Sequence, residues 1–333
     1  MNDPKISVII PLYNAEKYIR ECLISVLSSK FTDYEVLVVD DCSTDKSVEE
    51  AKKLLPYFDG RLRILSSGKN SGGPGIPRNI GIKNAAGKYV TFIDNDDMIL
   101  PTALGDFFKL AECYNADIIH TEKCFSFSGE FNKNKLNICL LCKKEYLVDK
   151  PTLEPFDISE RVRHFTCKGL NCVPWSKLYR RDFILANKIE FPQMQFGEDF
   201  VFVFKCFCLA ERYFFVPNIT NIHRGGISSA SHVTCGSLQE GAQLALNILL
   251  KKVAIIDEFM TGLKFFKDNP ECQRDILKCC MGGDFRIVKN LFRNVKPHVL
   301  QKILLDEWQK PEYDMHGKDI VATYLLAERL SDI

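Results

Sequence analysis

Two acidic clusters follow short apolar runs of the sequence. They are Asp40-Asp41, after residues 36–39, and Asp94-Asn95-Asp96-Asp97, after residues 89–93. If both runs are buried parallel strands, the clusters meet at one sheet edge, where open α/β sheets bind their ligands. Carboxylates crowded in this way repel one another unless a cation binds. The second cluster, an Asp-x-Asp pair with another Asp beside it, suits Mg²⁺ or Mn²⁺, which take further ligands from substrate phosphates. The alternative is a solvated acidic turn.

The common glycine-rich phosphate cradles are absent from the sequence. Gly73-Pro-Gly-Ile-Pro-Arg78 breaks the pattern G-x-G-x-x-G, and no G-x-x-x-x-G-K-[ST] occurs. A nicotinamide dehydrogenase and a P-loop NTPase are therefore disfavoured. A diphosphate bound at this edge would be neutralised by the metal and by a cation such as Arg78, together with amides of the glycine-rich loop.

Apolar runs and helical periodicity predict the elements that position these groups. Strands are expected at residues 6–10, 36–39, 62–65, 89–93 and 213–216, because near-continuous aliphatic runs are typical of strands buried on both faces. Helices alternate with the first of them, and Asn14 is suited to cap the first helix. Residues 122–166 have no clear period and are interpreted as a variable insertion. Amphipathic helices are expected at 244–266, 276–292 and 299–308.

Composition sets the class of protein. The chain has 333 residues, with 44 Lys and Arg against 43 Asp and Glu, so a dedicated nucleic-acid binder is excluded and one large or two ordinary domains are expected. No apolar run approaches the roughly 18 to 20 residues of a spanning helix, and the N-terminus has no signal-peptide pattern. Fourteen cysteines without an export signal predict a reducing cytoplasm. Cys139 and Cys142 lack a second C-x-x-C pair, which disfavours zinc.

Four blocks in chain order resemble glycosyltransferase family 2. They are ISVIIPLYN at 6–14, VVDDCSTD at 38–45, N-x-G-G with RN-x-GI at 70–82, and GKYVTFIDNDD at 87–97. Looser blocks at 175–179, 196–200 and 222–228 resemble the acceptor-side blocks of bacterial members that build surface polysaccharides. The resemblance implies an α/β GT-A fold, with a Rossmann-like, mostly parallel twisted sheet flanked by helices. It also implies a catalytic domain at 1–235, with halves at 1–120 and 121–235, and a helical C-terminal region at 236–333.

The resemblance also implies roles for individual residues. The catalytic base would be Asp199, because an inverting displacement needs a carboxylate opposite the leaving diphosphate. Metal residues would be Asp96, Asp97 and His223, and acceptor or donor-sugar residues would be Trp175 and Glu198. The implied nucleotide-binding residues are Pro11, Tyr13, Asn14, Asp41, Arg78, Asp94 and Asp96.

Each assignment has a structural alternative. Tyr13 and Trp175 could fill the core, Arg78 could be a solvated or ion-paired surface residue, and His223 could be structural. Residues 197–199 could cap the helix that follows them, where acidic side chains suit the helix dipole.

The function expected from these residues is a metal-dependent, inverting transfer of sugar from a nucleotide donor, taken to be a UDP-sugar, to a glycan or lipid-linked acceptor. Sugar-phosphate nucleotidyl transfer is the alternative enzyme class, although the basic glycine-rich start common there is missing from residues 6–14. A non-catalytic nucleotide-sugar-binding protein is disfavoured by the intact Asp96, Asp97 and Asp199. The C-terminal region is expected to pack on the catalytic domain or form a homodimer. Peripheral contact with the inner face of a membrane, through residues 263–266, is the rival.

Overall fold

The computed structural model describes residues 3–142, 144, 147–168, 170–225 and 237–280, with single positions at 299, 302, 303, 305, 306, 309 and 318. An eight-stranded sheet forms the centre, in the order β3-β2-β1-β4-β10-β6-β11-β9. Its strands are β1 (Ile6–Leu12), β2 (Tyr34–Asp40), β3 (Leu62–Ser66), β4 (Tyr89–Phe92), β6 (Ile118–Thr121), β9 (Thr152–Leu153), β10 (Lys177–Arg180) and β11 (Tyr213–Val216).

The sheet is mostly parallel, as predicted. Only β9 and β10 run against the other strands of this sheet. Successive side chains of β1 enter two different cores, since Val8 and Ile10 pack on one face and Ile9 on the other. Both faces of the strand are therefore buried, which explains why its sequence is a continuous apolar run.

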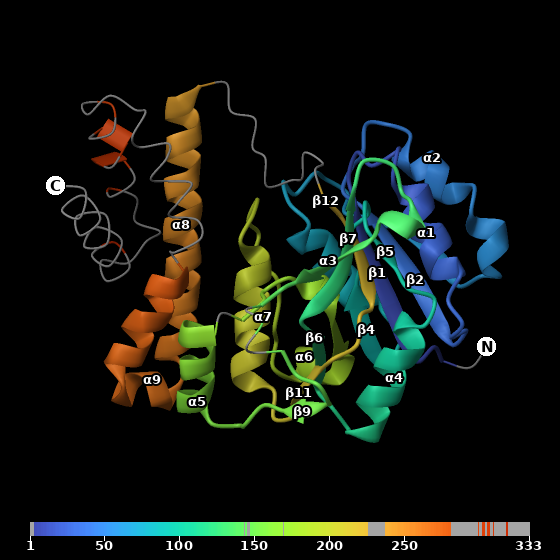
Figure 1. Cartoon of the computed structure of the whole chain (residues 1–333). Helices are drawn as coiled ribbons and strands as arrows, with labels where there is room; N and C mark the ends of the chain where they lie inside the picture. The colour runs from blue at the N-terminus through green and yellow to red at the C-terminus, as the bar shows by residue number, and fades with distance from the viewer. Residues whose placement is uncertain are drawn as a thin grey trace.

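Helices cover both faces of the sheet (Figure 1). One core includes α1, α2 and α4, and the other includes α3, α5, α6, α7 and α8. The helices and short helical turns are α1 (Ile19–Leu27), α2 (Ser47–Lys52), η1 (Leu55–Phe58), α3 (Gly75–Asn84), α4 (Ala103–Cys113), η2 (Lys133–Lys135), α5 (Ile158–Arg163), η4 (His164–Lys168), η5 (Pro174–Ser176), α6 (Arg181–Ala186), α7 (Glu198–Leu209), α8 (Leu238–Thr261) and α9 (Lys264–Asp268).

The predicted cap of the first helix is wrong. Helix α1 is preceded by Tyr18, whereas Asn14 lies four residues earlier in a left-handed conformation with φ of 46°. The Asn14 side chain instead accepts a hydrogen bond from the Thr44 amide at 2.8 Å, across to the loop after β2. Asn14 thus joins two loops at the carboxyl edge of the sheet.

A second sheet of four strands lies beside the first, in the order β5-β12-β7-β8. Its strands are β5 (Met98–Ile99), β12 (Asn221–Gly225), β7 (Lys123–Ser128) and β8 (Asn137–Leu140). Strands β7 and β8 form a hairpin within residues 122–166, where no element was predicted. Much of β8 is exposed, so its sequence lacks the alternation of a half-buried strand.

Helix α8 lies against α7, and α9 follows it (Figure 1). The predicted single stretch at 244–266 is thus divided at Gly262, and residues 270–280 are also helical. Phe266 is fully buried in the core that α7 and α8 share. Packing on the catalytic region is therefore confirmed for residues 237–280.

Residues 281–292 of the second predicted helix lie outside the described residues, as does most of the third. No helix in the described part of the chain is long and apolar enough to cross a membrane.

Candidate active site

The carboxyl ends of the parallel strands bring the predicted residues to one edge. Tyr13 and Asn14 follow β1, Asp41 follows β2, and residues 94–97 follow β4. Because β1 pairs with both β2 and β4, these three loops are neighbours. The turn before α7 adds residues 198 and 199 to the same edge through ion pairs with Arg78.

The loops after β1 and β2 form the nucleotide side of the edge. Tyr13 is 47% exposed, so the core alternative for this ring is wrong. Pro11 is buried, and its carbonyl accepts a hydrogen bond from the Asn95 side chain at 2.9 Å. Asp41 is also buried and accepts hydrogen bonds from the amide and hydroxyl of Ser71 at 3.0 and 2.9 Å. Asp41 therefore ties the glycine-rich loop to the sheet.

The glycine-rich loop packs against protein. A Cβ atom at Gly73 would lie 2.4 Å from the Met194 carbonyl oxygen, so the close approach of the two loops requires glycine there. The loop thus shapes the wall of the site between Asp41 and the segment before α7.

Arg78 is the central cation of the edge. Its side chain is 2% exposed and ion-paired, so the predicted alternative is right about ion pairing and wrong about a surface location. Its guanidinium donates to Asp94 at 2.7 Å, to Glu198 at 3.1 Å and to Asp199 at 2.5 Å. Three protein carboxylates therefore surround the group that was expected to face a diphosphate, and that expected role is corrected to one of holding carboxylates.

The candidate base lies at the start of α7. Gly197, with φ of 86°, precedes the helix, and the acidic pair occupies its first turn, so the capping alternative is also correct. Burial raises the pKa of Asp199, and Arg78 opposes that rise. The Asp199 side chain is 31% exposed, so a substrate hydroxyl can reach it.

Glu198 lies deeper than predicted. Its side chain is only 4% exposed, so direct contact with a sugar is contradicted by burial. Burial and then the charge of Asp199 raise the pKa of Glu198 well above its ordinary value. Glu198 is thus a buried neighbour of Asp199 rather than a group on the surface of the site.

The acidic loop after β4 has a different balance of charge. Asp94 pairs with Arg78, but burial and the charges of Asp97 and Asp94 raise the pKa of Asp96 to about 6. Asp97 is fully buried, and its two oxygens lie 3.1 and 3.0 Å from Nδ1 of His223. Its hydrogen bond raises the pKa of His223. The Asp97 carboxylate is therefore already hydrogen-bonded to a side chain of the protein.

The predicted metal residues were tested against this geometry. Among the described residues, no group of three or more His, Cys, Asp and Glu side chains is arranged to hold a metal. Asp96 and the outer nitrogen of His223 nevertheless fit an ion that takes its remaining ligands from water and a diphosphate. Asp97 is hydrogen-bonded to Nδ1 of His223, and a carboxylate in this position orients a histidine that binds a metal through its other ring nitrogen. Its predicted place as a direct ligand is corrected accordingly.

Trp175 fills space beneath the site. It is 5% exposed, and its ring stacks on that of His223, with centroids 5.7 Å apart and planes at 10°. The core alternative for Trp175 is therefore what the structure shows. Lys177, two residues later, is buried and donates to the carbonyls of Asn171 and Val173 at 2.8 and 2.7 Å, which fixes the Trp175 loop.

Arg224, which the sequence offered together with His223 as a candidate for diphosphate or metal contact, is buried instead, with a side chain 6% exposed. Its amide donates to Asp97 at 2.9 Å, and its side chain donates to the Asp96 carbonyl at 3.1 Å. The same guanidinium pairs with Glu21 of α1. Arg224 therefore fixes the acidic loop rather than facing a ligand, and its adjacency to His223 was the available signal.

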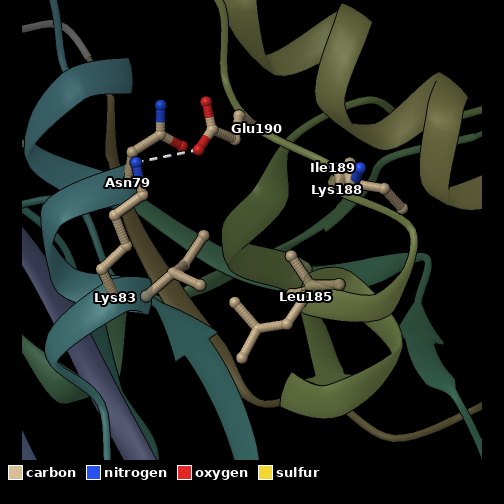
Figure 2. Close-up of a pocket in the computed structure, with 8 residues that line it drawn as sticks. Asn79, Lys83, Leu185, Lys188, Ile189 and Glu190 are labelled. Carbon is tan, nitrogen blue, oxygen red and sulfur yellow. Dashed lines mark ion pairs between the residues drawn. The ribbon is translucent and has the colours of Figure 1, made fainter.

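A pocket of about 140 Å³ lies away from these residues, between the end of α3 and α6 (Figure 2). An ion pair of 2.9 Å between Lys83 and Glu190 lies at its mouth. None of the acidic site residues lines it, so this pocket is separate from the candidate active site.

Comparison with known proteins agrees with the class that this fold and edge define, an α/β protein of the GT-A type. A model of glycosyl transferase family 2 matches residues 7–185, which is more than half of the chain. This chain therefore belongs to glycosyl transferase family 2, and the predicted membership is confirmed.

Two bacterial relatives illustrate the match. Poly(ribitol-phosphate) beta-N-acetylglucosaminyltransferase TarS of Staphylococcus aureus is 32% identical over 217 residues, which cover 62% of this chain and 33% of TarS. The uncharacterized glycosyltransferase YibD of Escherichia coli is 33% identical over 241 residues, covering 67% of this chain and 65% of YibD. The matched part thus spans about a third of TarS.

Solved structures confirm the GT-A fold. TarS residues 1–349 in complex with UDP-GlcNAc superpose with a TM-score of 0.58 at 25% identity, over 87% of this chain and 84% of that one. A mannosyltransferase from Pyrobaculum calidifontis, PcManGT, in complex with GDP-Man and Mn²⁺, superposes with a TM-score of 0.52 over 98% and 81% of the two chains. At 13% identity this second likeness concerns the fold alone.

Proposed function

We propose that this protein is an inverting glycosyltransferase that moves a sugar from a nucleotide diphosphate, a UDP-sugar, to a hydroxyl of a glycan or lipid-linked acceptor in bacterial surface polysaccharide synthesis. The observation that carries the proposal is the pairing of two acidic groups at one sheet edge. One group has an excess of negative charge at Asp96, and the other presents a partly exposed Asp199 held by Arg78. The family membership and the TarS complex with UDP-GlcNAc support the choice of donor.

The donor would lie across the loops after β1, β2 and β4. Exposed Tyr13 offers a surface for the base, while Pro11, Asn14 and Asp41 shape the loops beneath it. A divalent ion held by Asp96 and His223 would stabilise the charge that develops on the departing diphosphate.

The acceptor hydroxyl would approach the exposed part of the Asp199 side chain. Transfer forms a bond from the acceptor oxygen to the anomeric carbon and breaks the bond to the diphosphate, while the acceptor proton passes to the Asp199 carboxylate. Arg78 holds Oδ1 of that carboxylate, which fixes its direction before substrates arrive. A location in the cytoplasm, a homodimer and contact with the inner face of a membrane stay predictions.

The test is a panel of nucleotide sugars, incubated with Mn²⁺, Mg²⁺ or a chelator, with products resolved by mass spectrometry. We expect release of a nucleoside diphosphate, by transfer or slow hydrolysis, from one or a few donors, and only with a divalent ion. Pyrophosphate release from a nucleoside triphosphate and a sugar phosphate would instead indicate a nucleotidyltransferase. Binding of nucleotide sugars with no turnover under any condition would favour a non-catalytic protein, and full turnover in chelator would remove the metal.

A further inference from the structure

Exposed apolar side chains gather on the hairpin of β7 and β8. Phe131 is 42% exposed, Ile138 62% and Leu140 40%, all within ten residues of chain. In the stretch 263–266, the sequence's rival candidate for membrane contact, Phe266 is fully buried and Leu263 and Phe265 are half-buried. The hairpin therefore offers one exposed apolar surface to a partner.

The same hairpin is basic. Residues 131–144 contain four lysines and no acidic residue, although the chain as a whole carries a net charge of only +1. Of these lysines, Lys133, Lys135 and Lys144 are exposed in the structure. We call Phe131, Lys133, Lys135, Ile138, Leu140 and Lys144 the basic hairpin surface.

The basic hairpin surface adjoins the candidate active site. Strand β7 pairs on one side with β8 and on the other with β12, which carries His223 and Arg224. The Arg224 guanidinium packs over the ring of Phe127 at 4.7 Å, and Phe127 in turn packs edge-on against Phe131 at 5.3 Å. Chain contacts thus lead from the acidic loop to the exposed end of the hairpin.

We propose that the basic hairpin surface docks on a lipid bilayer that displays anionic headgroups. On such a bilayer the apolar side chains would insert at the acyl boundary, and the lysines would contact the lipid phosphates above it. A soluble polyanion would satisfy the lysines but leave Ile138 and Leu140 in water. Pairing of two copies along the β8 edge would bring like charges together, which is how edge strands avoid association. The inference is independent of the proposed function, because docking needs neither donor nor acceptor.

The experiment is flotation of the full chain with vesicles at physiological salt, without nucleotide or metal. We expect it to float with phosphatidylcholine vesicles containing 30 mol% phosphatidylglycerol, and to remain at the bottom with phosphatidylcholine alone. Each lysine near an anionic surface contributes about fivefold to partitioning. Lys133→Gln with Lys135→Gln should therefore weaken binding about twentyfold or more, and Ile138→Ser with Leu140→Ser should also reduce it strongly.

Matched controls come from α2 and η1, which pack against the eight-stranded sheet rather than the four-stranded sheet of the hairpin. Tyr57, 63% exposed in η1, serves as Tyr57→Ser, and Lys52→Gln with Lys53→Gln removes two exposed charges from α2 and its C-cap. Both should float like the unmodified chain, and circular dichroism confirms that every variant is folded. The proposal is overturned if the unmodified chain fails to float, or if hairpin and control variants bind equally. It is also overturned if soluble polyphosphate binds as tightly as vesicles, or if light scattering shows that the hairpin variants convert a dimer to a monomer.

Discussion

Two groups of carboxylates lie at the same sheet edge, and they differ in the charged side chains that surround them. In the loop after β4, the pKa of Asp96 is raised to about 6 by burial and by its neighbours Asp97 and Asp94. At the start of α7, burial also raises the pKa of Asp199, but Arg78, 2.5 Å away, opposes that rise. Among the described residues, the Asp96 carboxylate forms no ion pair with a lysine or arginine, whereas Asp199 pairs with Arg78 of α3.

The difference indicates what each group is for. A carboxylate in negative surroundings gains most from a cation that arrives with a ligand, which suits the donor side. A carboxylate already held by a buried guanidinium is fixed in direction before any substrate binds, which suits a base. The acidic loop is thus built to receive charge, and the α7 turn to hold a group in place.

Asp199→Asn should have the largest effect, because it keeps the shape of the side chain and removes its proton affinity. We expect the transfer rate to fall by about a hundredfold to ten-thousandfold, with the affinity for nucleotide nearly unchanged. Steady-state rates and calorimetric titration with UDP measure the two quantities.

Glu198→Gln is the matched control for Asp199→Asn. Glu198 is buried behind Asp199, and glutamine keeps its shape and its hydrogen-bonding capacity. Turnover should change little. Greater damage from Glu198→Gln than from Asp199→Asn would move the base one residue back along α7.

Arg78→Met removes the cation that distinguishes the two groups. It leaves Asp94, Glu198 and Asp199 without their shared partner in a buried site, so we expect a loss of about 3 to 5 kcal/mol in the free energy of unfolding. Urea denaturation measures it. Lys278→Met, which breaks an exposed pair with Asp275, should leave the midpoint almost unchanged. An equally small change at Arg78 would show that the carboxylates are balanced by something else.

The sequence predicted the central sheet well because its strands are buried on both faces. Continuous apolar runs located β1, β2, β3, β4 and β11 to within a few residues. It missed β6, β9 and β10 of the same sheet, which are 4, 2 and 4 residues long. It also missed β7 and the exposed edge strand β8, whose lysine, cysteines and asparagine follow no regular alternation.

The candidate site was predicted in part. The acidic clusters were found because strand ends of a parallel sheet meet at one edge, and that edge is where Asp41 and Asp94 lie. The burial of Arg78 could not be predicted, because two of its three partners are 120 and 121 residues away in the chain. Helix periodicity alone did not distinguish an inward arginine from a surface one.

Asp96→Asn should act on the donor side alone. Removing one carboxylate from the acidic loop should weaken metal-dependent UDP binding by about tenfold or more, because the divalent ion loses a charged ligand. Calorimetry with Mn²⁺ and then with chelator measures this, and binding in chelator should change little. An unchanged affinity with Mn²⁺ would show that the ion is held elsewhere.

Glu122 is a buried carboxyl outside both acidic groups. Its titration tests whether a buried lysine stabilises a carboxylate as an arginine does. Glu122 is buried near Lys177, yet burial raises its pKa to about 7. A carboxyl whose pKa is higher in the folded state favours folding below its unfolded pKa of 4.5, and this contribution is lost as pH rises through 7. Lys177, with a pKa of about 8, titrates above this range.

His120, 3.2 Å from Glu122, has a lowered pKa and acts in the opposite direction, so the measurement must be a difference. The free energy of unfolding of the unmodified chain, minus that of Glu122→Gln, should fall by about 2 to 3 kcal/mol between pH 4.5 and 7.5. Urea denaturation at intervals of pH gives the curve, and the subtraction removes groups that do not contact Glu122, so the difference reports Glu122 together with its coupling to His120. A flat difference would mean that Lys177 keeps Glu122 ionised in the folded protein throughout this range. A buried lysine would then be as effective a partner as Arg78, and the contrast between the acidic loop and the α7 turn would depend on the presence of any cation rather than on the guanidinium of Arg78.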